Sequence, residues 1–317
     1  MTSHETASLE PSTEALAGRG PARVLKRLLR ATRPMFFPAS VLPVVVGTSW
    51  GYREAHALDA VTAALALAAV VVVHAAANVL NDVFDEDTDR VNGRRIHPYT
   101  GGSRFIQNQV MSRQAMAVWG FALVLLGTIL GAALLFQAGP GVLGFGMAGL
   151  ALAVLYSAPP ARLSARGVGE AAVGVGFGVL PVMGAAWLQT GHLSPAAFAV
   201  SLPVSLWVAS ILLINEVPDR DADRDAGKRT LAVRLALPDT RRLYLGLQLL
   251  AIGLAVLYGV VGLLAPVSIA VLLLLPAALK AARALGGSER SQRRGIELTL
   301  LVHTAGSLWL ALCAAAF

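Results

Sequence analysis

Two segments of the chain carry the same acidic pattern. They are NDVFDEDTDRVNGRR at 81–95 and NEVPDRDADRDAGKR at 215–229, and 8 of their 15 aligned positions are identical. In each segment an Asn and two Asp follow one another at steps of four residues. Because residues four apart lie on one side of a helix, each segment predicts a polar stripe. The two triplets are Asn81, Asp85 and Asp89 in the first segment, and Asn215, Asp219 and Asp223 in the second.

Such stripes predict the binding of divalent cations. Stacked carboxylates repel one another unless some are protonated or cations lie among them. Oxygen ligands without Cys or a close His pair suit Mg²⁺, with Mn²⁺ as an alternative. Two stripes that face each other could hold a diphosphate through two or more Mg²⁺ ions. The alternative, a solvated acidic helix end, fits a single segment better than two segments with matched spacing.

Neighbouring residues extend or interrupt the stripes. Asp82 joins the first stripe, and Asn78 continues it one turn into the apolar run that precedes it. Asp87 and Asp221 fall on the opposite side of the helical wheel and are expected to face water. Pro218 indicates that the second segment kinks or begins a new helix.

Apolar runs must position these residues. The chain has 317 residues, of which 56% are hydrophobic and 14% are charged, which is too apolar for an ordinary soluble domain. Runs long enough to cross a bilayer as helices recur, and we therefore predict an all-α, polytopic membrane protein. The nine expected spans are 35–52, 60–80, 115–136, 140–157, 168–189, 195–214, 243–263, 266–284 and 296–316.

The positive charges indicate how this bundle is oriented. With nine spans and the N-terminus in the cytoplasm, 25 of the 26 Lys and Arg lie on the cytoplasmic side, and only Arg53 lies outside. This is the positive-inside pattern, and it predicts a multi-pass protein of the cytoplasmic membrane. Four spans separate the two acidic segments, so both emerge on the cytoplasmic face. The distribution also argues against a nucleic-acid partner, despite a net charge of +7.

The chain is expected to form one folded domain. Residues 1–20 are polar and predict a disordered tail, and 21–317 predict a single transmembrane domain with a central cavity. An approximate internal repeat, spans one to four and five to eight, would explain the paired segments. The loops 84–114 and 216–242 are far longer than ordinary linkers in helical bundles. We expect them to cap the cavity on the cytoplasmic side.

Two basic residues are further candidates for the site. Lys228 follows the second acidic segment and can contact phosphate, although the positive-inside rule alone also accounts for it. Arg104 follows two glycines in the first long loop and can pair with a carboxylate or phosphate. The alternative for Arg104 is an ordinary flexible loop with a basic end.

The motifs resemble those of a known family. Asn-Asp-x2-Asp-x3-Asp at 81–89, and Asp-x3-Asp at 219–223 followed by GKRTLAV, resemble the UbiA superfamily of intramembrane aromatic prenyltransferases. The resemblance extends to Arg33-Pro34 and to YSAPPARLSARGVGE at 156–170. It implies that a polyprenyl diphosphate binds through Mg²⁺ to the two Asp motifs. Its allylic C–O bond then ionises, and the carbocation alkylates an electron-rich aromatic ring.

The resemblance also implies roles for individual residues. Tyr156 would lie near the reacting centre, where its aromatic face can stabilise a cation, although an interfacial Tyr is an equal alternative. The implied metal ligands are Asp82, Asp85, Asp89, Asp219 and Asp223. The implied catalytic residues are Asp82, Asp85, Tyr156 and Asp219. The expected substrate-binding residues are Asn78, Asn81, Arg104, Arg162, Asn215 and Lys228.

The loop sequence indicates a branch of this superfamily. HPYTGGSRFIQ at 97–107, together with GKRTLAV, looks most like the branch that prenylates 1,4-dihydroxy-2-naphthoate in menaquinone synthesis. A 4-hydroxybenzoate or other aromatic or lipid prenyltransferase remains an alternative. A membrane transporter is a non-enzymatic alternative, because intramembrane carboxylates and internal repeats also occur in transporters. A CDP-alcohol phosphotransferase would need Asp-Gly and Ala-Arg at positions where this chain lacks them.

Overall fold

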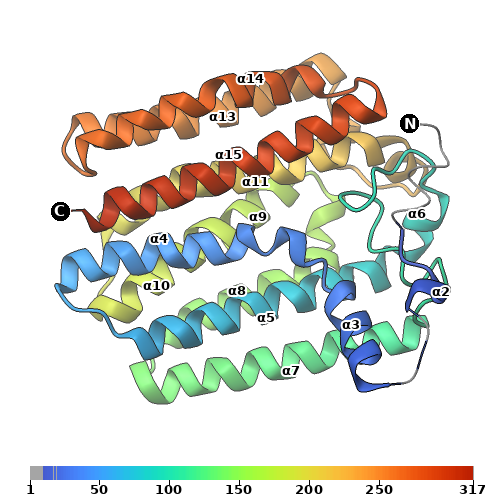
Figure 1. Ribbon diagram of the computed structural model, residues 1–317, viewed down its shortest axis with the longest axis horizontal. Coiled ribbons are helices and arrows are strands. Elements are labelled where there is room, and N and C mark those ends of the chain that lie inside the picture. Colours follow the sequence, from blue (N-terminus) through green and yellow to red (C-terminus); the bar gives the residue numbers. More distant parts are fainter. Residues whose placement is uncertain (1–9, 17, 19, 317) are drawn as a thin grey trace.

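Helices account for the architecture of the chain. The computed structural model describes residues 10–16, 18 and 20–316. Most helices run roughly along the long axis of the molecule (Figure 1). The long helices are α4 (Pro38–Ala55), α5 (Ala60–Phe84), α7 (Arg113–Ala138), α8 (Val142–Ser157), α10 (Leu180–Thr190), α11 (Pro195–Asp225), α13 (Leu237–Val260), α14 (Leu275–Ala284) and α15 (Glu289–Ala315). The short α9 (Gly169–Gly174) continues through the π-helical segment Val175–Val179 into α10, and the 3₁₀ segment Pro266–Leu274 leads into α14.

Each of the nine predicted spans coincides with one of these helical segments. Among the described residues, seven helical segments are long and apolar enough to cross a membrane: Ala60–Phe84, Arg113–Ala138, Gly169–Thr190, Pro195–Asp225, Leu237–Val260, Pro266–Ala284 and Glu289–Ala315. The other two are shorter or more polar. α8 is apolar but has 16 residues, and α4 has 18 residues with Arg53 and Glu54 near its end. The prediction of an all-helical, polytopic membrane protein is confirmed.

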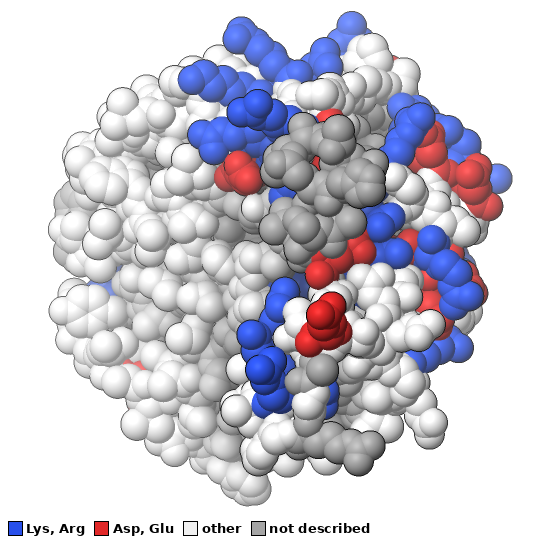
Figure 2. All heavy atoms as spheres, turned by 45° about the vertical axis from the view of Figure 1, so that its right-hand side comes forward, with Lys and Arg blue, Asp and Glu red and all other residues white. Residues whose placement is uncertain are grey.

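The connecting segments gather at two ends of the bundle. At one end, arginine side chains near the helix ends donate to backbone carbonyl groups of the connecting segments. These hydrogen bonds join Arg33 to Tyr99, Arg234 to Arg166, Arg241 to Leu285 and Arg293 to His97, at 2.7 or 2.8 Å. Figure 2 shows most of the visible charged side chains gathered at this end. At the other end, Arg53 donates to the carbonyl oxygen of Leu263 at 2.9 Å.

Small residues let the helices pack closely, as is common in membranes. Gly47 of α4 lies against α10, where a Cβ atom would stand 2.2 Å from the carbonyl oxygen of Val182. Gly306 of α15 lies against the buried ring of Trp207 on α11. A Cβ atom on Gly306 would stand 2.5 Å from that ring. The two helix pairs therefore have no room for a larger side chain at these positions.

The helix breaks differ from expectation. α5 ends at Phe84, and α6 (Glu86–Val91) begins after a junction at Asp85, so the first acidic segment is divided between two helices. The second segment lies in α11, which continues through Pro218 to Asp225. The new helix, one of the two alternatives predicted at Pro218, is therefore wrong, because α11 is continuous there. Most of the apolar part of α11 is buried in the bundle, and this packing offsets the helix-breaking cost of proline, about 3 kcal/mol.

Part of the predicted polar tail is folded onto the bundle. α2 (Thr13–Leu16) buries Leu16 against a cluster that includes Phe105 and Met116. The side chain of Glu10 is 9% exposed, and its carboxylate pairs with Arg95 at 2.7 Å. Residues 10–16 therefore differ from the disordered tail that their composition predicts, while 1–9, 17 and 19 lie outside the described residues.

Candidate active site

A cavity inside the bundle reaches the charged end. Its volume is about 560 Å³, and its walls come mainly from α5, α7, α8, α10 and α11. The wall near the charged end is polar, and the remainder is largely apolar, with residues such as Val142, Leu143 and Leu188. Both predicted triplets line it: Asn81, Asp85, Asp89, Asn215, Asp219 and Asp223. The two acidic segments therefore face one cavity, as their matched spacing suggested.

Lys228 links the two segments. Its Nζ lies 2.9 Å from Oδ2 of Asp85 and 3.2 Å from Oδ1 of Asp223. Burial lowers the pKa of Lys228, but the carboxylates of Asp85 and Asp223 outweigh this effect, so the pKa is raised. The ammonium group therefore stays charged beside the cavity.

The loop after the first acidic segment closes over the carboxylates. Asp219 accepts hydrogen bonds from Nδ2 of Asn92 at 2.6 Å and from the backbone N–H of Gly101 at 3.2 Å. Asp82 accepts from the backbone N–H of Ser103 at 3.1 Å. The loop residues 92–103 thus contact acidic residues of both segments. This supports the prediction of a cap at the charged end.

A glycine lets this loop approach Asp89. Gly102 has a φ of +72°, and a Cβ atom there would lie 2.2 Å from Oδ2 of Asp89. Burial raises the pKa of Asp89 well above its usual range, and the neighbouring charges of Asp82, Asp85 and Asp219 raise it further. A bound cation beside Asp89 would relieve this crowding of negative charge.

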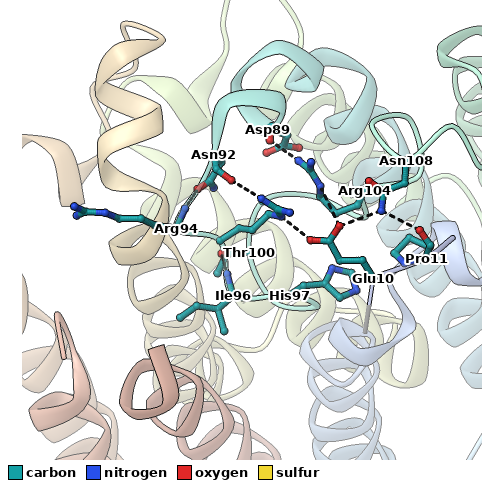
Figure 3. A network of polar contacts seen from close by, with 12 residues as sticks. Glu10, Pro11, Asp89, Asn92, Arg94, Ile96, His97, Thr100, Arg104 and Asn108 are labelled. Atoms are coloured by element: carbon teal, nitrogen blue, oxygen red, sulfur yellow. Dashed lines mark hydrogen bonds and ion pairs between the residues drawn. The ribbon is translucent and has the colours of Figure 1, made fainter. Parts of the chain in front are cut away.

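Arg104 belongs to a network behind the cap. Its guanidinium donates to the carbonyl oxygen of Asp89 and lies 3.9 Å from Glu10. Nδ2 of Asn108 donates to Glu10 at 3.0 Å. Figure 3 shows the carboxylate of Glu10 directed toward Arg104 and Asn108. Arg104 is buried and does not line the cavity, and its partners lie in α6 and in the N-terminal segment.

The remaining predicted residues are placed as follows. Asn81 donates from Nδ2 to Asp85 at 2.9 Å and to Ser157 at 3.0 Å. Asn78 and Tyr156 line the cavity, and Asn78 donates to the carbonyl oxygen of Thr32 at 2.9 Å. Oδ1 of Asn215 is buried without a hydrogen-bond partner among the described residues.

Asp82 and Arg162 do not line the cavity. Asp82 is buried behind its wall, where it holds Ser103. Arg162 lies at the rim, with its side chain 41% exposed and its Nη2 3.8 Å from Oδ1 of Asp85. Asp87 is exposed and Asp221 is half-exposed, as the helical wheel predicted.

The motifs missed several residues of the site. Asn92 holds Asp219, and it stands where the second segment has Ala226. A polar residue that breaks the match between the two segments could have marked Asn92 as a site residue. Glu216 aligns with Asp82 in the repeat and lines the cavity. Ser157, the last residue of α8, accepts a hydrogen bond from Nδ2 of Asn81, and it lies in the stretch 156–170 that carries the resemblance.

The donor set fits Mg²⁺ that is shared with a diphosphate. In the described part of the chain, no three acidic, His or Cys side chains converge on one point where they alone could hold a metal ion. Mg²⁺ commonly takes one or two carboxylates and completes its shell with water and substrate phosphate. Asp85 and Asp89 on one side, with Asp219 and Asp223 on the other, offer that arrangement.

Comparison with known sequences gives related proteins. The model of the UbiA prenyltransferase family matches residues 40–314. A 1,4-dihydroxy-2-naphthoate octaprenyltransferase of Mycobacterium tuberculosis is 31% identical over 278 residues, which cover 86% of this chain and 89% of the relative. The Escherichia coli enzyme of the same name is 29% identical over a region that covers 68% of this chain and 70% of that enzyme. UbiA prenyltransferase domain-containing protein 1 of Xenopus tropicalis is 30% identical over a region that covers 64% of this chain and 58% of the relative.

Solved structures share the fold. A UbiA homolog from Archaeoglobus fulgidus, bound to GPP and Mg²⁺, aligns with a TM-score of 0.62 at 15% identity, covering 92% of this chain and 99% of that one. The apo structure of a UbiA homolog from Aeropyrum pernix aligns with a TM-score of 0.63 at 20% identity, covering 84% and 98%.

Proposed function

This chain belongs to the UbiA prenyltransferase family and transfers prenyl groups to an aromatic acceptor; we propose that its donor is a polyprenyl diphosphate and its acceptor 1,4-dihydroxy-2-naphthoate. The choice of acceptor is supported by the relatives named for that activity, at about 30% identity. Membership of the family displaces the transporter and phosphotransferase alternatives.

One observation carries the proposal. The oxygen-rich triplets of both acidic segments line a single cavity whose remaining wall is largely apolar. A polyprenyl diphosphate has the same division, with a highly charged head and a long apolar tail. The head would lie between Asp85, Asp89, Asp219 and Asp223, and the tail along α5, α7 and α8.

The residues of the site would act on the leaving group and on the cation. Mg²⁺, held by those four carboxylates, would neutralise charge that develops on the departing diphosphate. Lys228 adds a fixed positive charge at the same place, between Asp85 and Asp223. The ring of Tyr156 would stabilise the allylic cation. The apolar wall and the loop 92–103 would keep water from that cation.

Asn81, Asn215, Asp82, Arg104 and Arg162 have supporting roles in this proposal. Asn81 orients Asp85, and Asn215 offers an amide to the head group. Asp82 and Arg104 hold the loop that closes the site. Arg162 lies at the rim beside Asp85, where a diphosphate or an anionic acceptor enters.

The proposed location is the cytoplasmic membrane, with the charged end in the cytoplasm. The positive-inside rule supports this orientation, because the charged end contains the loops rich in Lys and Arg (Figure 2). The water-soluble acceptor would then enter from the cytoplasm, and the prenyl donor from the lipid.

The test is an assay of the purified protein in lipid vesicles. We expect it to convert 1,4-dihydroxy-2-naphthoate and a long prenyl diphosphate into a prenylated, decarboxylated quinol, and to stop when EDTA is added. Asp85→Asn and Asp219→Asn are expected to lower turnover by orders of magnitude, whereas Asp87→Asn, on the exposed side, is expected to leave it unchanged. A higher kcat/KM for 4-hydroxybenzoate would overturn the acceptor. Near-normal turnover of either site variant at saturating Mg²⁺ would overturn the site.

A further inference from the structure

Two buried carboxyl groups meet beside the cavity. Glu170 of α9 is 6% exposed and Glu216 of α11 is 7% exposed. They lie within hydrogen-bond reach of each other. Neither carboxyl oxygen of Glu170 receives a hydrogen bond from any other residue in the described part of the chain. Glu216 lines the cavity, and its Oε2 accepts one long hydrogen bond, from the backbone N–H of Ala232 at 3.5 Å.

This pair differs from the acidic triplets in having no cation. Lys228 pairs with Asp85 and Asp223, whereas no ion pair within the described residues joins Glu170 or Glu216 to a Lys or Arg. Two carboxylates in contact cannot both stay ionised in a buried place without a counter-charge. The pair therefore shares one proton and carries one negative charge. Such a pair can accept a proton from a neutral donor such as a ring hydroxyl.

The pair lies next to the place where the chemistry occurs. Glu216 precedes Asp219 by three residues, which is about 4.5 Å along the helix axis toward the apolar part. Tyr156, on the facing helix α8, is near enough to interact electrostatically with Glu170, Glu216 and Asp85. If the diphosphate lies at Asp219 and Asp223, the allylic carbon and the ring that attacks it lie beside Glu216.

We propose that Glu216 binds a hydroxyl group of the aromatic acceptor and takes its proton as the new carbon–carbon bond forms. Glu170 is a positioning residue, because it takes the proton that the pair shares and so leaves Glu216 free to accept the proton of the hydroxyl. This role rests on the proposed function, since it needs an acceptor with a hydroxyl group.

The step balances for an acceptor that loses its carboxylate. The allylic C–O bond breaks, and diphosphate leaves with the electron pair. The ring carbon that bears the carboxylate bonds to the allylic carbon, while the adjacent hydroxyl gives its proton to Glu216. The C–C bond to the carboxylate then breaks and releases CO₂, and its electrons restore the aromatic ring. The oxygen recovers its proton from Glu216, so no net proton is gained or lost.

A purely architectural role for Glu216 is the competing explanation. The aligned residue, Asp82, holds its own loop through the N–H of Ser103, and Glu216 likewise contacts Ala232, in the short helix α12 (Leu231–Arg234) after the second segment. Loss of a loop contact would disturb the whole site, including the ionisation of the allylic C–O bond of the prenyl diphosphate. Loss of a proton acceptor would affect only the reaction of the ring.

The experiment separates these two effects with one partial reaction and one acceptor analogue. Ionisation alone is followed by scrambling of an ¹⁸O label between the bridging and non-bridging positions of the prenyl diphosphate. Glu216→Gln is expected to leave the scrambling rate within about twofold, and to lower kcat/KM for the acceptor at least 100-fold, the usual range for general acid–base catalysis. Glu297→Gln, a half-exposed residue of α15, is the matched control and is expected to change neither.

The analogue carries a methoxy group in place of the hydroxyl beside the carboxylate. The wild-type protein is expected to use it at least 100-fold less well, and Glu216→Gln is expected to show no further loss with it. Glu170→Gln retains a donor to Glu216 and should keep acceptor turnover within about tenfold, whereas Glu170→Leu should lose more, with scrambling unchanged.

Several results would overturn the inference. One is wild-type tolerance of the methoxy analogue, which needs no variant and so does not depend on whether Glu216→Gln folds. Another is the joint loss of scrambling and transfer in a folded Glu216→Gln protein. A wild-type protein that prenylates no aromatic acceptor would instead reject the proposed function, and a preference for 4-hydroxybenzoate would move the same comparison to that acid and its methoxy analogue.

Discussion

Lys228 contacts a carboxylate of each acidic segment, Asp85 and Asp223. We expect Lys228→Met to raise the KM for the prenyl diphosphate by about 10- to 100-fold, because a hydrogen bond to a charged group contributes about 1.5–3 kcal/mol. Steady-state kinetics in lipid vesicles would measure it. Arg224→Met removes an exposed cation of α11, paired with Asp221, and should have no effect. An unchanged KM in Lys228→Met would show that the ammonium group does not contact the donor.

Gly102 is the second residue with a sharp consequence. Its positive φ disfavours any side chain, at a cost of about 1–2 kcal/mol, and a Cβ would collide with Asp89. We therefore expect Gly102→Ala to lower prenyl transfer at least tenfold. Gly93→Ala is the matched control, since Gly93 lies in the same loop with open space around it. Comparable activity of the two variants would contradict the close approach of the loop to Asp89.

At the scale of elements, the N-terminal segment 10–16 depends on one ionised group. Burial raises the pKa of Glu10, but hydrogen bonds from Arg95 and Asn108 outweigh it, so the pKa is lowered from 4.5. A lowered pKa stabilises the docked segment above pH 4.5, and this stabilisation is lost as pH falls through the lower, folded value. Hydrogen exchange of 10–16, corrected for intrinsic rates, should therefore accelerate below about pH 4.5.

Variants test this assignment. Glu10→Gln is expected to give fast exchange in 10–16 already at neutral pH, and to lose the acid dependence. Glu14→Gln removes an exposed carboxylate of α2 and should behave as wild type. If both variants keep the segment protected, the carboxylate of Glu10 is not what holds it in place.

The elements also show what the sequence could and could not predict. Apolar runs of membrane length predicted the helices, because length and composition alone decide whether a helix can span a bilayer. The four-residue spacing predicted which side chains face the cavity. The break at Asp85 was not predictable, since it depends on contacts far along the chain, such as that of Asp82 with the backbone N–H of Ser103. Order in 10–16 was missed for the same reason: Glu10 finds Arg95 85 residues away.

At the scale of the whole molecule, the two ends must lie on opposite sides of the membrane. In a Cys313→Ala background, Asp239→Cys is expected to react with an impermeant maleimide only from the cytoplasmic side. Gln137→Cys and His192→Cys, both exposed at the other end, are expected to react only from outside. Labelling of positions 239 and 192 from the same side would contradict nine crossings.

The hydrogen bond from Arg293 to the carbonyl oxygen of His97 spans 196 residues of sequence. During synthesis that separation is a delay: at about 5–20 residues per second, roughly 10–40 s pass between the two residues leaving the ribosome. Throughout this interval the loop over the acidic residues lacks its support from α15. The nascent protein therefore exposes an incomplete site until its last helix is made, and a chain released before that point would carry every acidic residue of the site under an unsecured cap.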